Sequence, residues 1–123
     1  MIPGVVATMK HLTLSETIAL YIMSRTTEEL TQLTRYSIAE TFKINKSYLS
    51  KRFKEDLDLS VSNYIDLEKA VRSRILMASM ERATVEEIAS QLGIAKPQQF
   101  RAKFKKVFCT TPGRFIHYAG KTE

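Results

Sequence analysis

The sequence is poor in the residues that build most catalytic and metal centres. Its single cysteine, Cys109, excludes an internal disulfide and every site that needs several cysteines, and it fits a reducing compartment. His11 and His117 are the only histidines, whereas a cysteine nucleophile needs a nearby base or another activating charge. No glycine-rich phosphate loop, zinc-ligand pattern or nucleophile-elbow motif is present. We therefore predict that the chain is no enzyme and has no metal site and no cofactor.

Helix breakers and long apolar runs are also scarce. Four glycines and three prolines stand among many Leu, Ile, Ala, Lys, Glu and Gln residues, and no alternating apolar and polar run indicates a strand. The predicted fold class is therefore all-α. No apolar run approaches the roughly 18 residues that span a bilayer, and residues 1–4 lack the basic start of a signal peptide. We expect a soluble, cytoplasmic protein that has no membrane partner.

Positive charge, by contrast, is plentiful. The 123 residues carry 19 Lys and Arg against 13 Asp and Glu, which gives a formal net charge of +6. This excess suits a polyanionic partner, but charge alone does not choose between DNA, RNA and an acidic membrane surface.

Capping boxes mark several helix starts. In a capping box a Ser or Thr precedes a Glu by three residues, and each side chain satisfies an exposed backbone amide of the other. Such boxes begin at Thr13, Thr26 and Thr84. Ser60 opens a long helical segment that runs to about Met80, and Thr111 is followed by a proline, which suits the first helical position.

An internal repeat is the most informative pattern in the chain. Apolar positions of a first copy recur fifty residues later, and positions further along recur after fifty-one, so the second copy has one extra residue in or beside its turn. The matched residues are Ile38, Ala39, Phe42 and Ile44 with Ile88, Ala89, Leu92 and Ile94, then Leu49, Phe53 and Lys54 with Phe100, Phe104 and Lys105. Each copy combines a short helix, a tight connection and a second helix, which is the pattern of a helix-turn-helix unit.

The segment between the copies has apolar residues on more than one face, so one helix could pack against both units. We predict two lobes joined by this helix. The expected divisions are an N-terminal tail (1–12), a first lobe (13–59), the connecting helix (60–80), a second lobe (81–119) and a C-terminal tail (120–123). The helix would set the separation and rotation of the lobes.

The second helix of each copy carries a cationic outward face. Five positive residues and no acid lie between Lys43 and Lys54, and the same holds between Lys96 and Lys106. The apolar residues of these helices are expected to form the core, which leaves a polar stripe for the major groove of DNA. We predict base-reading roles for Lys46, Ser47, Ser50, Lys51, Gln98, Gln99 and Arg101, and phosphate contacts for Lys43, Arg52, Lys54, Lys96 and Lys105.

Gln98 and Arg101 are the strongest candidates for readers, because Gln can bond adenine bidentately and Arg can bond the acceptors of guanine. The alternative is a basic helical module that binds RNA or an acidic surface without base specificity. RNA readers place aromatics to stack on bases, and membrane helices expose bulky apolar faces, whereas the aromatics of these helices are needed in the core. A helix face that is polar only because it meets solvent could explain one cationic stripe. It is a weaker explanation for two stripes, one on the second helix of each copy.

The combined pattern resembles the signature of the AraC/XylS transcription regulators over roughly residues 37–116. The residues that carry the resemblance in the second copy are Ile88, Ala89, Gly93, Ile94, Phe100, Phe104, Lys105, Lys106, Thr111, Pro112 and Phe115. Those in the first copy are Ala39, Leu49, Lys51, Phe53, Lys54, Leu59 and Ser60.

The resemblance implies a bacterial, sequence-specific regulator that binds double-stranded DNA at the nucleoid. Two recognition helices, at about 46–55 and 97–107, would enter successive major grooves, which recur about 34 Å apart. It also implies RNA polymerase as a further partner and, if the chain is a fragment, a sensor domain.

The chain departs from the family's pattern at several positions. Asp58 and Cys109 stand where the family usually has glycine after each second helix, and Cys is expected to tolerate a left-handed backbone less well than Asp, so the turn at Cys109 should differ. Ala102 replaces a frequent arginine, and Pro97 replaces a small polar residue. Both changes lie in the predicted recognition helix of the second lobe, so they affect how this lobe is expected to recognise DNA.

Overall fold

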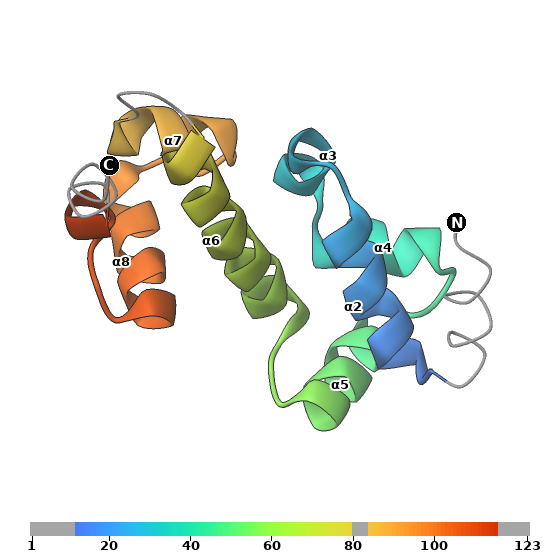
Figure 1. The fold of residues 1–123 in the computed structure, drawn as a ribbon. Coiled ribbons are helices and arrows are strands. Elements are labelled where there is room, and N and C mark those ends of the chain that lie inside the picture. The colour runs from blue at the N-terminus through green and yellow to red at the C-terminus, as the bar shows by residue number, and fades with distance from the viewer. Residues whose placement is uncertain (1–11, 80–83, 116–123) are drawn as a thin grey trace.

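The computed structural model describes residues 12–79 and 84–115, and every regular element within these ranges is a helix (Figure 1). The predicted all-α class is therefore confirmed. The helices are α2 (Leu14–Ser24), α3 (Thr27–Gln32), α4 (Arg35–Thr41), α5 (Lys46–Leu57), α6 (Val61–Ser79), α7 (Val85–Gln91) and α8 (Pro97–Phe108). The predicted C-terminal tail, most of the N-terminal tail, His11, His117 and the expected helix end at Met80 lie outside the described residues.

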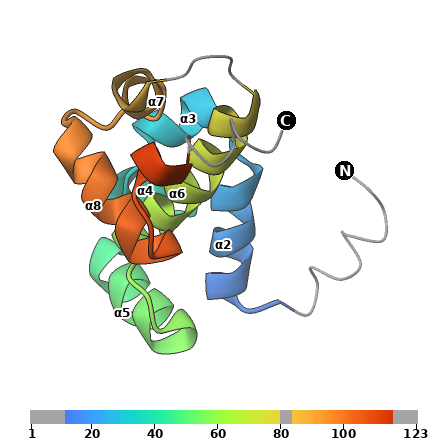
Figure 2. The same cartoon turned by 60° about the vertical axis from the view of Figure 1, so that its left-hand side comes forward.

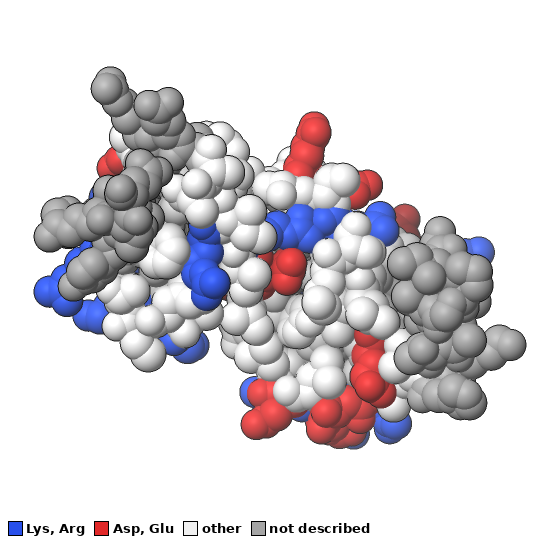
Figure 3. Space-filling model, viewed as in Figure 1, with Lys and Arg blue, Asp and Glu red and all other residues white. Residues whose placement is uncertain are grey.

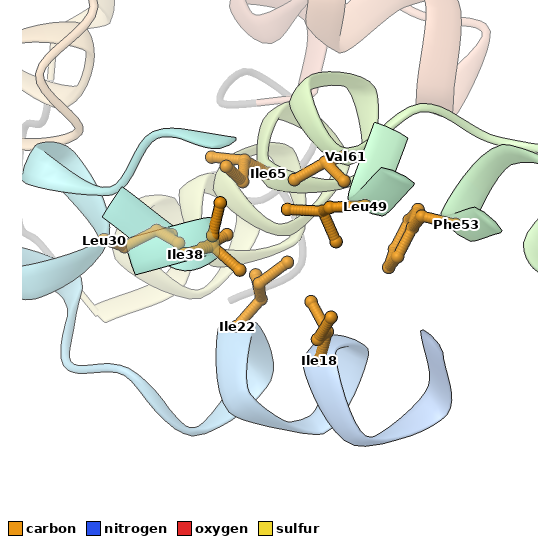
Figure 4. Packing of buried hydrophobic residues seen from close by; sticks show 9 residues of the cluster. Ile18, Ile22, Leu30, Ile38, Leu49, Phe53, Val61 and Ile65 are labelled. Atoms are coloured by element: carbon orange, nitrogen blue, oxygen red, sulfur yellow. The ribbon is translucent and has the colours of Figure 1, made fainter. Parts of the chain in front are cut away.

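We call α2 to α5 the first lobe, and α7, α8 and the helical turn at 112–115 the second lobe. Figure 1 shows the long helix α6 running between them. Each lobe has its own hydrophobic core. The first consists of Ile18, Ile22, Leu30, Ile38, Ala39, Leu49, Phe53, Val61 and Ile65 (Figure 4), and the second of Met77, Ile88, Ala89, Leu92, Phe100 and Phe104. Because α6 supplies residues to both cores, the prediction that this helix packs against both lobes is confirmed.

The helix starts follow the capping residues. The boxes at Thr13 and Thr26 are complete, with each hydroxyl 3.1 Å from the amide nitrogen that it accepts from. At Thr84 the hydroxyl also accepts from the amide of Glu87, but the Glu87 carboxylate accepts from the hydroxyl rather than from the backbone amide. The third predicted box is therefore only half formed, although the helix begins where it was expected.

The connection between the two helices of each repeat has the predicted difference in length. Residues 42–45 separate α4 from α5, and residues 92–96 separate α7 from α8, which confirms the extra residue of the second copy. Both turns pass through a left-handed residue, Lys43 at φ 55° and Gly93 at φ 71°. The amide of Ile44 then bonds to Ala39 O at 3.0 Å, and the amide of Ile94 bonds to Ala89 O at 2.9 Å.

The lobes also touch each other directly at the second turn. A Cβ atom added at Gly93 would lie 2.8 Å from Thr31 Cβ of α3, closer than real Cβ contacts allow. Lys43 adopts nearly the same φ in the first lobe, so the dihedral angle alone does not require glycine here. The close approach of α3 is the additional reason that this position has no side chain.

Polar contacts tie α6 to each lobe. The Arg72 side chain, only 12% exposed, pairs with Glu68 at 3.2 Å and donates to the Met23 carbonyl at 3.0 Å. On the other side, Lys103 Nζ of α8 lies 3.1 Å from Asp66 Oδ1. These contacts hold both lobes against one helix, which fixes how the lobes sit relative to each other.

Helices α5 and α8 end in the same way. Asp58 (φ 55°, ψ 31°) and Cys109 (φ 60°, ψ 18°) are left-handed C-caps, and their amides bond to Lys54 O at 2.9 Å and Lys105 O at 2.8 Å. The expectation that the turn at Cys109 differs is wrong. The cap hydrogen bond and the packing of the following segment impose the glycine-like conformation on cysteine.

Cys109→Gly is expected to raise the free energy of unfolding by about 0.5 to 1 kcal/mol, because a left-handed residue with a Cβ is strained whereas glycine is not. Asp58→Gly is the matched control and should give a smaller gain, since Asp tolerates this conformation better. Urea unfolding of the three proteins measures the difference. A loss of stability in Cys109→Gly, or a larger gain in Asp58→Gly, would contradict the assignment of strain.

Candidate nucleic-acid interface

Helix α5 presents its polar stripe because its two ends and its buried face are fixed. The Asn45 side chain caps the helix by accepting from the amides of Ser47 and Tyr48 at 2.8 and 3.2 Å. Leu49 and Phe53 are 1% and 0% exposed, so the opposite side of the helix faces solvent. The core role predicted for these two residues is confirmed.

A shallow, open hollow of about 590 Å³ lies along this exposed side. We call it the cationic hollow, and it is lined by Arg35, Tyr36, Lys46, Ser47, Ser50, Lys51, Lys54 and Glu55. The structure thus brings together all four predicted base readers of the first lobe and one predicted phosphate contact. Four of its eight lining residues are cationic and one is acidic, so the hollow favours an anion.

Two predicted phosphate contacts of the first lobe do not line the hollow. Lys43 is exposed in the turn before α5. Arg52 Nε lies 3.1 Å from Asp56 Oδ2, which also accepts from the Ser15 hydroxyl of α2 at 2.7 Å. Arg52 therefore takes part in the polar contacts between α5 and α2 rather than in the stripe.

Arg35 and Tyr36 are members of the hollow that the sequence did not indicate. Arg35 donates to the Tyr36 hydroxyl at 2.9 Å, and Lys46 Nζ lies 5.0 Å from the centre of the Tyr36 ring. The hydrogen bond from Arg35, together with the positive charges of Arg35 and Lys46, lowers the pKa of the Tyr36 phenol below its ordinary value. No repeat pattern marked them, because Val85 and Glu86 occupy the corresponding positions of the second copy.

Helix α8 begins with Pro97 and buries Phe100 and Phe104, which are 1% and 0% exposed, so the predicted core role is confirmed here too. The predicted readers Gln98, Gln99 and Arg101 are exposed, as are Lys96 and Lys105. Arg101 is not free, because its Nη2 lies 3.3 Å from Glu86 Oε1 of α7. The sequence did not reveal this partner.

Helices α5 and α8 lie on the same side of the molecule. Figure 2 shows α5 and α8 at the left of the view, with α2 towards the other side. Figure 3 shows Lys and Arg side chains at the lower left of the face seen in Figure 1, near α8, and a group of Asp and Glu side chains at its lower edge, near α5.

Other kinds of site find little support in the part of the chain that the structure describes. No group of three or more His, Cys, Asp or Glu side chains is placed to hold a metal ion among residues 12–79 and 84–115. Cys109 is exposed in its turn, and both histidines lie outside the described residues. None of the described helices is long and apolar enough to cross a membrane.

Comparison with known proteins identifies the fold and the family. The family described as "Helix-turn-helix domain" matches residues 38–117, more than half of the chain. The chain therefore belongs to this helix-turn-helix family, of the AraC/XylS type that the sequence resembles. This is a family of DNA-binding regulatory domains and not of enzymes, as predicted.

Two curated relatives illustrate the match. The chain is 32% identical over 84 residues to the HTH-type transcriptional regulator YtdP of Bacillus subtilis, covering 68% of this chain and 11% of YtdP. It is 35% identical over 72 residues to the xylose operon regulatory protein of Escherichia coli, covering 58% of this chain and 18% of that protein. The chain thus spans less than a fifth of the length of either relative.

Solved structures confirm the two-unit fold. The C-terminal domain of AraT, a response regulator from Geobacillus stearothermophilus, superposes with a TM-score of 0.73 at 23% identity, covering 88% of each chain. The DNA-binding domain of the transcriptional factor AdpA, solved in complex with a target DNA, also gives a TM-score of 0.73, at 14% identity, covering 89% of this chain and 95% of that one.

Proposed function

We propose that this chain binds double-stranded DNA sequence-specifically as the DNA-binding part of a transcription regulator, with α5 and α8 entering successive major grooves. The observation that carries the proposal is that the second helix of each copy has a cationic stripe, and that these two helices, α5 and α8, lie on one side of the molecule (Figure 2). Solubility alone would not require both copies to lack acids from residue 43 to 54 and from residue 96 to 106. Grooves on one side of B-form DNA recur about 34 Å apart, which two helices held by a rigid connection can match.

The proposed base readers are Lys46, Ser47, Ser50 and Lys51 in α5, and Gln98, Gln99 and Arg101 in α8. Lys43, Lys54, Lys96 and Lys105 are the proposed phosphate contacts, and we add Arg35 because it lines the cationic hollow. Arg52 is expected to contribute less, since Asp56 holds its Nε on the side of α2.

The test begins with selection of bound duplexes from a random pool, which is expected to yield two boxes about one helical turn apart. On the selected duplex, Gln98→Ala or Arg101→Ala should relax base preference at one position by about 1 to 3 kcal/mol. Lys54→Ala and Lys105→Ala should instead weaken selected and scrambled duplexes alike and lower the slope of log affinity against log salt by about one unit each. If all four substitutions weakened every duplex equally, the reading roles would be wrong.

The alternative is a module that binds RNA or an acidic surface without base specificity. Competition between the selected duplex, a structured RNA and anionic vesicles distinguishes the two hypotheses. Only the proposed function predicts that the protein binds the duplex in preference to the RNA and the vesicles. The exposed tyrosines Tyr36 and Tyr48, 51% and 52% exposed, could stack on splayed bases and make this control worthwhile.

We propose that the whole regulator acts in the cytoplasm at the nucleoid and contacts RNA polymerase. The relatives are several times longer than this chain, which supports a sensor domain elsewhere in a longer protein.

A further inference from the structure

The contact between Glu86 and Arg101 joins the two helices of the second repeat at the edge of the proposed recognition face. Glu86 Oε1 in the first turn of α7 lies 3.3 Å from Arg101 Nη2 in the middle of α8. The side chains are 63% and 45% exposed, so the pair is surrounded by water and contributes little to stability. A role in holding the fold is therefore a poor explanation for this acid on an otherwise cationic face.

The first lobe shows that this position regularly faces the recognition helix. Tyr36 occupies the place in α4 that Glu86 occupies in α7, and its ring lies 5.0 Å from Lys46 Nζ of α5. In both repeats the second residue of the first helix thus contacts a side chain of the outward stripe. The repeat geometry delivers a side chain there, and in the second lobe that side chain is a carboxylate aimed at a proposed reader.

We propose that Glu86 is a positioning residue that raises base discrimination by orienting Arg101, a proposal that rests on the function proposed above. A guanidinium has five N–H donors, and the bond to Glu86 uses one at Nη2, which leaves others for the N7 and O6 acceptors of guanine. Holding the guanidinium in advance reduces the rotamer entropy lost on binding. The negative charge of Glu86 also weakens binding to every duplex alike, and this uniform effect does not change discrimination.

The test compares Glu86→Gln with Glu87→Gln, a matched control with the same change of charge one residue further along α7. The glutamine at 87 can still accept from the Thr84 hydroxyl, so the helix start is preserved. Both variants should bind scrambled duplexes somewhat more tightly than the wild type, because each removes one negative charge. Only Glu86→Gln should lose discrimination, by about fivefold or more, at the base pair that Arg101 reads.

A double-variant comparison shows whether the effect passes through Arg101. In an Arg101→Ala background, Glu86→Gln should leave discrimination unchanged, since the oriented group is no longer present. If Glu86→Gln instead tightened binding to all duplexes with discrimination intact, Glu86 would merely compete with DNA for Arg101, and the inference would be overturned. If the wild type itself showed no base preference, the proposed function would fail first and the inference with it.

Discussion

Phe104→Ala is expected to lower the free energy of unfolding by about 3 to 5 kcal/mol. The Phe104 ring is 0% exposed and lies 4.7 Å from the centre of the Phe108 ring, 5.8 Å from that of Phe100 and 5.9 Å from that of Phe115. Its removal leaves a cavity at the centre of the smaller core. Denaturant unfolding measures the loss.

The separation of the two cores predicts where the loss appears. In Phe104→Ala, backbone amides of α7 and α8 should lose protection from hydrogen exchange, whereas those of α2 to α5 should keep most of theirs. Phe53→Ala is the matched control, because Phe53 is the repeat counterpart and is also 0% exposed. It should produce the reverse pattern. Equal loss of protection in both lobes from either variant would show that the chain unfolds as one unit.

Arg72→Met should lower the free energy of unfolding by about 3 kcal/mol, because it removes one partner of a largely buried ion pair. Arg72 and Glu68 are 12% and 16% exposed, so the remaining carboxylate would lie in a poorly solvated position without its cation. The bond to the Met23 carbonyl, which ties α6 to α2, would also be lost. We therefore expect weaker preference for one spacing of the two DNA boxes, measured on duplexes with inserted base pairs.

Arg74→Met provides the matched control for this prediction. Arg74 lies two residues further along α6 and is exposed, with its guanidinium 5.2 Å from the Phe108 ring centre, so its replacement should cost no more than about 1 kcal/mol. Replacing Glu68 with leucine together with Arg72→Met should recover most of the lost stability, because no unpaired charge then remains. If Arg72→Met cost no more than Arg74→Met, the contacts of Arg72 with Glu68 and with the Met23 carbonyl would not stabilise the fold in solution.

The sequence predicted those parts of the fold that depend on neighbours along the chain. The spacing of Leu49 and Phe53, and of Phe100 and Phe104, places each pair on one helix face, and the buried side of the recognition helix follows directly. The capping boxes located helix starts for the same reason. Thr34 and Ser37 form a complete box at the start of α4 that was missed, because serine replaces the glutamate of the usual pattern.

The candidate site was predictable only in part, because several of its contacts join residues far apart in sequence. Glu86 and Arg101 are fifteen positions apart, and nothing in the pattern of either helix identifies the other as partner. The same applies to Arg52, whose position beside α2 depends on how Asp56 meets Ser15. The number of Lys and Arg residues indicated a cationic helix. It could not show which of these side chains pair with acidic side chains of the same protein.

The close approach of Gly93 to Thr31 makes the two halves of this duplicated chain no longer interchangeable. Exchanging the turn of the second copy for that of the first would place the Lys43 side chain where Thr31 leaves no room, although the backbone angles of the two turns are nearly alike. Matching positions of the two turns are thus expected to differ strongly in their tolerance of mutation. Any side chain at position 93 would push the two lobes apart, because Thr31 leaves no space for it. A protein engineer who wants a different spacing between the two DNA boxes would therefore begin at this position.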